Sequence, residues 1–337
     1  TSVWSWKSHR DITRVLSNDH MDVAHFHNVF PLISPSAYYA ARQATIPVVQ
    51  TLHNYRLLCP GATFFRAGRV CEDCVGKTLP WPGVVHGCYR GSRAATTAVA
   101  NMLVVHRLLG TWQRMVDVYI ALTEFARRKF IAGGLPAEKI VVKPNFVHPD
   151  PGVGAHDGGY AIFVGRLSPE KGVETLLKAW RGRGGRVPLR LVGDGPLAPL
   201  VADAAARGNG SEWLGRQPVS AVYDAIGRAA VLIFPSEWYE GMPRTIVEAY
   251  AKGTPVIAAD IGAVAELVHD GRTGLLFRPG DADDLAAKVE WAWAHPREMA
   301  ALGREARREY EEKYTAERNY QLLMAIYEQA IERARRR

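Results

Sequence analysis

Short apolar runs alternate along the chain with longer segments in which apolar residues recur every three or four positions. The short runs are typical of buried strands, and the longer period is typical of amphipathic helices. The predicted strands are Val23–Phe26, Pro47–Leu52, Val118–Leu122, Ile140–Lys143, Tyr160–Val164, Pro188–Val192, Val231–Phe234, Pro255–Ala259 and Gly274–Phe277. The predicted helices include Val173–Trp180, Leu197–Ala206, Val219–Ala229, Arg244–Lys252 and Asp284–Ala294. This alternation predicts an α/β protein with parallel sheets covered by helices.

The stretch His148–Gly159 interrupts the pattern, because it is rich in Pro, Gly and Asp and has no periodicity. We expect an exposed linker there. A length of 337 residues suits two domains. We therefore predict an N-terminal domain over residues 1–147 and a C-terminal domain over residues 148–314. A helical pattern follows over residues 315–337, and we expect this helix to pack back on the N-terminal domain.

The composition is that of an ordinary globular protein, with 47% apolar and 23% charged residues. No apolar run approaches the roughly 20 residues of a membrane-spanning helix, and no apolar signal-peptide core opens the chain. The formal charge of +8 suits phosphorylated small molecules, an anionic membrane surface or nucleic acid. No nucleic-acid motif is present. We expect a cytoplasmic protein without a nucleic-acid partner.

Loops after predicted strands hold the candidate chemistry, because open parallel sheets bind ligands at the carboxyl ends of their strands. The loop Gly165–Gly172 contains Arg166 and Lys171, two cations that suit phosphate. A capped surface turn is the alternative explanation of this loop.

The loop Pro235–Pro243 is more informative. Pro243 suits the first position of a helix, whose free N–H groups would face a diphosphate. Glu240 lies in the loop, and Glu248 follows after seven intervening residues. Both carboxylates can accept hydrogen bonds from sugar hydroxyls. A helix cap and a surface carboxylate are the alternative.

Nine motifs follow one another over about 120 residues, roughly one domain. They are Phe163–Leu167, Glu170–Gly172, Leu191–Gly195, Phe234–Ser236, Glu240–Pro243, Glu248–Ala249, Gly253–Ala258, Gly262–Glu266 and Gly271–Leu276. In order and separation they closely resemble glycosyltransferase family 4. The resemblance implies a GT-B fold, in which two Rossmann-like domains face a cleft. It also implies retaining transfer from a nucleotide-diphosphate sugar, a UDP- or GDP-sugar, to an acceptor hydroxyl.

The resemblance implies a role for each matching residue. Arg166 and Lys171 would hold the donor diphosphate and stabilise the charge on the leaving group. Glu240 would contact the donor sugar near the reacting carbon. Gly241–Met242 would present backbone amides to the sugar or phosphate, and Glu248 would bind the ribose.

The N-terminal half resembles the family less closely, through Asp22–Asn28 and Thr51–Asn54. In the family a His on the second motif lies near the reacting centre on the acceptor side, which makes His53 the candidate here. A packed or capping His is the alternative. The family's first strand and Gly-rich loop have no counterpart, which amounts to roughly 60 residues in two strand–helix units. We expect that the sequence is incomplete rather than that the domain is degenerate.

The segment Asp281–Asp283 resembles a metal-binding Asp-x-Asp pair, but it follows Pro-Gly and opens a helix. We predict an N-cap there and no catalytic metal. The expected acceptor is a glycan, a lipid-linked sugar or a small molecule, in polysaccharide, glycolipid or other glycoconjugate synthesis. A GT-B nucleotide-sugar epimerase and a non-catalytic sugar-nucleotide-binding protein are the alternative functions.

All four cysteines lie within residues 59–88, namely Cys59, Cys71, Cys74 and Cys88. A Cys-x-x-Cys pair flanked by two more cysteines favours one structural Zn²⁺. Two disulfides and four free thiols are the alternatives.

The segment Trp81–Arg114 mixes aromatic, aliphatic and basic residues. They include Trp81, Arg90, Arg93, Met102, Leu103, Val104, Val105, Arg107, Leu108, Leu109, Trp112 and Arg114. Such a mixture suits peripheral contact with an anionic membrane surface. A helix buried in the core fits the same pattern.

Overall fold

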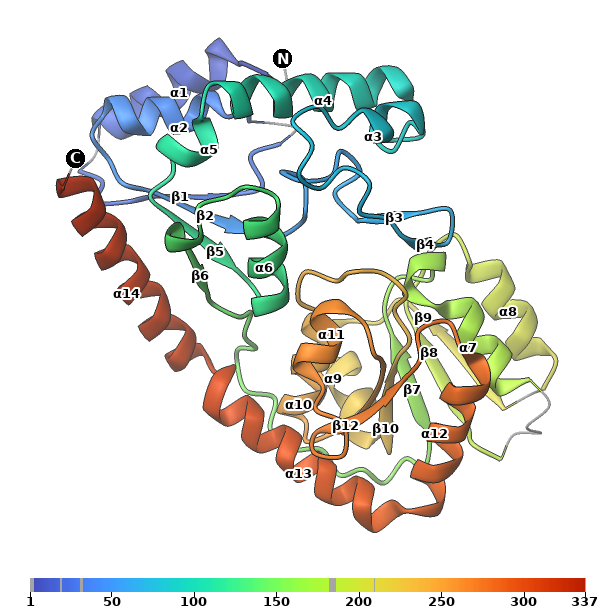
Figure 1. Ribbon diagram of the computed structural model, residues 1–337. Coiled ribbons are helices and arrows are strands. Elements are labelled where there is room, and N and C mark those ends of the chain that lie inside the picture. Colours follow the sequence, from blue (N-terminus) through green and yellow to red (C-terminus); the bar gives the residue numbers. More distant parts are fainter. Residues whose placement is uncertain (1–2, 19, 31–32, 182–185, 209, 337) are drawn as a thin grey trace. The chain divides into compact units, whose positions relative to one another are not determined.

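The computed structural model describes residues 3–18, 20–30, 33–181, 186–208 and 210–336. The chain divides into two compact units (Figure 1). The first unit contains residues 1–66, 70–144 and 320–337, and the second contains residues 67–69 and 145–319. Each unit has a parallel sheet covered by helices, which confirms the predicted α/β fold class.

The first unit is built on four parallel strands in the order β1-β2-β5-β6. They are β1 (Ala24–His27), β2 (Val48–Leu52), β5 (Val118–Ala121) and β6 (Ile140–Val142). His27 of β1 is in register with Thr51 of β2, so the carboxyl ends of these strands lie side by side.

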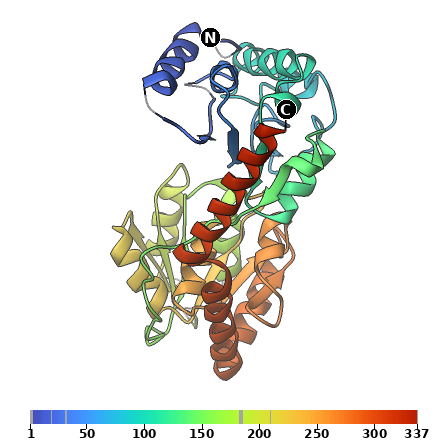
Figure 2. The same cartoon turned by 90° about the vertical axis from the view of Figure 1, so that its left-hand side faces the viewer.

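Helices cover this sheet, and a short hairpin lies in a long loop. The elements are α1 (Trp6–Asn18), α2 (Ser36–Gln43), β3 (Phe65–Arg66), β4 (Arg69–Val70), α3 (Trp81–Val85), α4 (Arg93–Leu108), α5 (Thr111–Arg114), α6 (Glu124–Ala132), η1 (Ala137–Lys139) and α14 (Ala316–Arg335). Ile326 and Ala330 of α14 are buried against Val49, Val118 and Ile120. Both views show α14 alongside the four-stranded sheet (Figures 1 and 2).

The second unit is built on six parallel strands in the order β12-β11-β10-β7-β8-β9. They are β7 (Ala161–Val164), β8 (Leu189–Val192), β9 (Ser211–Gly215), β10 (Val231–Phe234), β11 (Val256–Ala259) and β12 (Gly274–Phe277). From β7 the chain adds strands on one side, and from β10 it adds strands on the other. The topological switch point of the sheet therefore lies between β7 and β10.

The helices of the second unit are η2 (Pro169–Lys171), α7 (Val173–Trp180), α8 (Ala198–Ala206), α9 (Val219–Arg228), α10 (Arg244–Ala251), α11 (Gly262–Leu267), α12 (Ala282–Ala294) and α13 (Pro296–Lys313). Alternate strand residues such as Phe163 and Ile233 form one core with Leu176 of α7 and Leu285 of α12. Within the described residues, none of the helices is both long and apolar enough to cross a membrane.

The predicted exposed linker is attached to the second unit. The backbone N–H groups of Gly154, His156 and Gly158 donate to the carbonyls of Lys252, Gly227 and Arg228 at 2.8–2.9 Å. The segment contains no helix or strand, yet these bonds hold it against α9 and the end of α10. The lack of periodicity in this segment correctly predicted irregular backbone. It could not predict the backbone carbonyls to which the segment is hydrogen-bonded.

Candidate active site

Lys171 and Glu240 meet at the switch point of the second sheet. Lys171 ends η2 in the loop after β7, and Glu240 lies in the loop after β10. The Lys171 Nζ donates to Glu240 Oε1 at 2.6 Å. Neighbouring parallel strands deliver their loops to the same edge, so residues far apart in sequence come into contact there.

Further hydrogen bonds join the same two loops. The Ser236 hydroxyl donates to Glu240 Oε1 at 2.6 Å, and the Glu237 N–H donates to the Glu170 carbonyl at 2.9 Å. Glu240 is only 6% exposed. A carboxylate this buried needs such partners to offset its lost hydration, so the loops hold it in a defined position.

Gly172 allows the two loops to approach. It has a φ of +68°, and a Cβ at this position would lie 1.8 Å from the carbonyl oxygen of Pro235. A side chain would therefore push apart the loops that carry Lys171 and Glu240.

A cavity of about 240 Å³ opens at this edge of the sheet. It is lined by Phe163, Val164, Gly165, Lys171, Phe234, Pro235, Ser236, Glu240, Met242, Pro243, Arg244 and Thr245. Thus Lys171, Glu240 and Met242 come together as a group, with Gly241 between two of them in sequence. Arg166 is exposed and is not among the described residues that line the cavity.

Glu248 lies one turn along α10 from the cavity-lining Arg244. The Arg244 Nη2 is 3.3 Å from Glu248 Oε1. Burial raises the pKa of Glu248, and the Arg244 charge opposes that shift. Pro243 occupies the N-cap of α10 rather than the predicted first helical position. The sequence analysis did not single out Arg244, although its i,i+4 spacing from Glu248 predicts an ion pair.

His53 belongs to a histidine cluster at the carboxyl ends of β1 and β2. Its Nε2 is hydrogen-bonded to Nδ1 of His27 at 2.7 Å. His25 bonds the hydroxyls of Thr51 and Tyr327, each at 2.8 Å. His27 lies in the Asp22–Asn28 motif but was not predicted as a site residue, although the period of two in β1 places it on the same face as His25.

Burial sets the protonation of this cluster. Burial lowers the pKa of His53, and the neighbouring His27 and Lys143 lower it further. The pKa of His25 falls to about 4 through burial and the charges of His27, Lys143 and His53. These imidazoles are therefore neutral near pH 7, which suits hydrogen bonding and proton exchange.

The Asp281–Asp283 segment is a helix cap, as predicted. Oδ1 of Asp281 accepts the N–H groups of Asp283 and Asp284 at 3.1 and 2.9 Å. The segment begins α12 and satisfies two of its first donors.

The four cysteines line one cavity of about 20 Å³. All four are unbonded thiols. Among the described residues, no group of three or more His, Cys, Asp or Glu side chains is arranged to hold a metal ion. Burial and the neighbouring thiols raise the pKa of Cys74 to about 11.

The segment Trp81–Arg114 supplies both core and surface. Met102, Leu103 and Trp112 are buried, and the Arg107 guanidinium donates to the carbonyls of Leu57 and Thr78 at 2.7 and 2.9 Å. These four do not form the predicted surface. The large apolar side chains that remain exposed are Trp81, Val85, Val105, Leu108 and Leu109.

Comparison with known sequences covers both units. The profile described as "Glycosyl transferase 4-like domain" matches residues 2–145, and "Glycosyl transferases group 1" matches residues 152–309. An uncharacterised glycosyltransferase of Methanocaldococcus jannaschii, MJ1178, is 30% identical over 175 residues, covering 51% of this chain and 49% of that protein. The phosphatidyl-myo-inositol mannosyltransferase of Mycobacterium leprae is 31% identical over 250 residues, covering 69% and 65%. The chain thus spans about half to two thirds of the length of these curated relatives.

Among solved structures, the chain resembles Alr3699/HepE of Anabaena in complex with UDP, with a TM-score of 0.69 and 20% identity. The match covers 94% of this chain and 81% of that one. Two units with parallel sheets and this likeness define a protein of the GT-B fold. With both profiles matched in order, the chain belongs to glycosyltransferase family 4.

Proposed function

We propose that the protein transfers a sugar from a nucleotide-diphosphate sugar to an acceptor hydroxyl, with retention of the anomeric configuration. The observation that carries the proposal is the Lys171–Glu240 contact of 2.6 Å at the switch point of the second sheet. A cation and a carboxylate side by side suit a ligand that carries both phosphate and sugar hydroxyls.

In this proposal each residue acts on one part of the donor. Lys171 and Arg166 bind the diphosphate and stabilise the charge that grows on the leaving group. Glu240 contacts the sugar, Gly241–Met242 presents backbone amides, and Glu248 binds the ribose. Cations take the role that a metal has in other transferases, so catalysis needs no divalent ion. Activity should therefore survive EDTA in the short term, and an immediate, complete loss that Mg²⁺ or Mn²⁺ restores would contradict this.

On the acceptor side, His53 would lie near the reacting hydroxyl. The Mycobacterium leprae relative is named as a phosphatidyl-myo-inositol mannosyltransferase. This name supports testing lipid-linked sugars as acceptors beside glycans and small molecules. The Anabaena structure contains UDP, which favours UDP-sugars as the first donors to test before GDP-sugars.

The deciding experiment incubates the protein with a panel of UDP- and GDP-sugars, with and without acceptors, and follows nucleotide release and product stereochemistry by NMR. We expect one donor to be consumed, faster with acceptor, and the product to keep the anomeric configuration. An inverted product would refute retention. A changed sugar still attached to the nucleotide would indicate an epimerase, and binding without turnover would indicate a non-catalytic protein.

Although the described side chains are not arranged around a metal ion, we also propose, from the spacing of the four cysteines, that they move together to bind one structural Zn²⁺. Cys59, Cys71, Cys74 and Cys88 share one small cavity, and four thiolates would close the coordination shell. Metal content and thiol titration of untagged protein test this proposal. About one equivalent of zinc and protected thiols are expected. Less than about a tenth of an equivalent, with four reactive thiols, would refute it.

A membrane surface is the proposed peripheral partner of the first unit. Trp81, Val85, Val105, Leu108 and Leu109 are exposed apolar side chains. Arg90 lies in the turn between α3 and α4, and Arg93 begins α4. Such a surface suits an anionic interface. We expect co-sedimentation with phosphatidylglycerol vesicles at low salt, weakened by Leu108→Asp. Absence of co-sedimentation would refute the proposal.

A further inference from the structure

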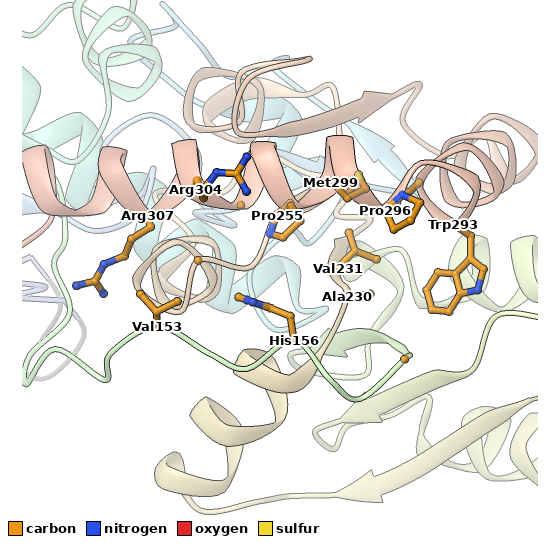
Figure 3. A pocket seen from close by; sticks show the side chains of 15 residues that line it. Val153, His156, Ala230, Val231, Pro255, Trp293, Pro296, Met299, Arg304 and Arg307 are labelled. Atoms are coloured by element: carbon orange, nitrogen blue, oxygen red, sulfur yellow. The ribbon is translucent and has the colours of Figure 1, made fainter.

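A second cavity of the second unit lies away from the Lys171–Glu240 contact. It has a volume of about 570 Å³, which is within the range of ligand sites, about 300–1,000 Å³. It lies at the beginnings of β10 and β11, between α13 and the attached segment around Val153 (Figure 3). We call it the amino-edge cavity, because it lies at the amino ends of these strands, at the opposite edge of the sheet from Lys171 and Glu240.

Most of the lining is apolar. The lining residues are Val153, His156, Gly159, Ala230, Val231, Gly253, Pro255, Ala292, Trp293, Pro296, Met299, Ala300, Gly303, Arg304 and Arg307. Three of these side chains are basic, and no acidic side chain is among the described residues of the lining. The cavity therefore combines an apolar wall with positive charge.

Two of the basic groups are already satisfied. Arg307 bonds both carboxylate oxygens of Asp150, at 2.8 and 2.6 Å, and Glu311 at 2.7 Å. Burial lowers the pKa of His156, whose ring also lies 3.3 Å from the Thr254 hydroxyl. At neutral pH, Arg307 is therefore compensated by its carboxylate partners and His156 is mostly neutral, so these two residues add little net positive charge to the cavity.

Arg304 is different. It lies on α13, one turn from Ala300, and its side chain is exposed at the rim of the cavity. In the described part of the chain it forms no ion pair. It is therefore an uncompensated guanidinium beside an apolar cavity, and a guanidinium pairs well with a carboxylate in a two-pronged geometry.

We propose that the amino-edge cavity binds a single-chain amphipathic carboxylate of the fatty-acid class. The alkyl chain would lie along Val231, Trp293 and Met299, and the carboxylate would pair with Arg304. A sugar would find few hydrogen-bonding side chains here, and a nucleoside diphosphate would find only one uncompensated cation. The proposal goes beyond the donor-site function and does not depend on it.

Calorimetric titration of the whole chain with potassium dodecanoate, below its micelle concentration, tests the proposal. We expect one molecule per chain and a negative heat-capacity change from apolar burial. Arg304→Gln should weaken dodecanoate binding about tenfold or more through loss of a charge-assisted contact. Arg308→Gln, on α13 outside the lining, should leave it unchanged.

Dodecanol and dodecyl phosphate separate the two parts of the ligand. Dodecanol should bind more weakly than dodecanoate and be insensitive to Arg304→Gln, because it has no charge to lose. Ala300→Phe should fill the cavity and reduce binding of both, with folding checked by circular dichroism. Dodecanoate binding that survives both substitutions would overturn the site. Binding of dodecyl phosphate without dodecanoate would overturn the carboxylate assignment.

Discussion

In the proposed donor site, Lys171 holds the diphosphate. Lys171→Ala should lower kcat/KM by about 100-fold, because it removes a charge that binds more strongly in the transition state. It also removes the 2.6 Å ion pair between Lys171 and the buried Glu240 carboxylate. Lys178→Ala, at an exposed position on α7, is the control and should behave as wild type. Wild-type kinetics in a folded Lys171→Ala protein would contradict the assignment. Arg166→Ala tests the second cation in the same assay.

Glu240 and Glu248 differ in their surroundings, so substitutions at the two positions should affect kcat and nucleotide affinity differently. Glu240→Gln should lower kcat while leaving UDP affinity within about twofold, since the proposed contact of Glu240 is with the sugar and not with the nucleotide. Glu248→Gln should weaken UDP binding about tenfold, through loss of the proposed hydrogen bond between this carboxylate and the ribose. Steady-state kinetics and UDP titration give both quantities. The reverse pattern would exchange the two roles.

His25 makes the stability of the first unit depend on pH. Its pKa is about 4 in the folded protein, against an ordinary value of 6.5. Between pH 6.5 and pH 4, His25 is therefore protonated in the unfolded chain but neutral in the folded chain. The free energy of unfolding consequently falls as the pH falls through this range. His25→Gln should lose less Tm than wild type between pH 7 and pH 5. His20→Gln, at an exposed site, is the control. Equal losses in all three proteins would disprove this origin.

Among the elements, the turn between η2 and α7 allows the loops that carry Lys171 and Glu240 to approach each other, and a substitution at Gly172 tests this. Gly172→Ala combines a positive φ with a Cβ 1.8 Å from a backbone oxygen. Gly271→Ala shares the positive φ, +71°, but has open space. The Gly271→Ala control should lower the free energy of unfolding by about 1 kcal/mol. Gly172→Ala should lower it by at least about 2 kcal/mol more. Urea unfolding measures both, and equal losses would mean that the loops move apart freely.

The elements also define how far sequence alone could go. Val231–Phe234 and Gly274–Phe277 were predicted as strands with the observed bounds, because each is a continuous apolar run. Strand β9 was not predicted, because Ser211–Gly215 is an edge strand that contains polar residues and therefore lacks a continuous apolar run. The Lys171–Glu240 contact follows from the strand-end rule. The His27–His53 bond required the register of β1 with β2, and the amino-edge cavity required the packing of α13.

At the scale of the whole chain, residues 320–337 belong to the first unit although they follow the second. Deleting them should uncover Val49, Val118 and Ile120, against which Ile326 and Ala330 pack. Exposed core of this size destabilises the sheet. Hydrogen exchange should rise in β2 and β5 far more than in β7 and β10. Uniform exchange in the two sheets would show that α14 adds nothing specific.

This interleaving also bears on synthesis. A ribosome delivers the chain from its amino end, and domains tend to fold as they emerge. Residues 145–319 can complete their own sheet in that order. The first unit cannot, because the helix that covers part of its core leaves the exit tunnel only after residues 145–319. The first unit is therefore completed only after the second has been synthesised, and until then the apolar side chains of β2 and β5 that α14 covers are open to aggregation.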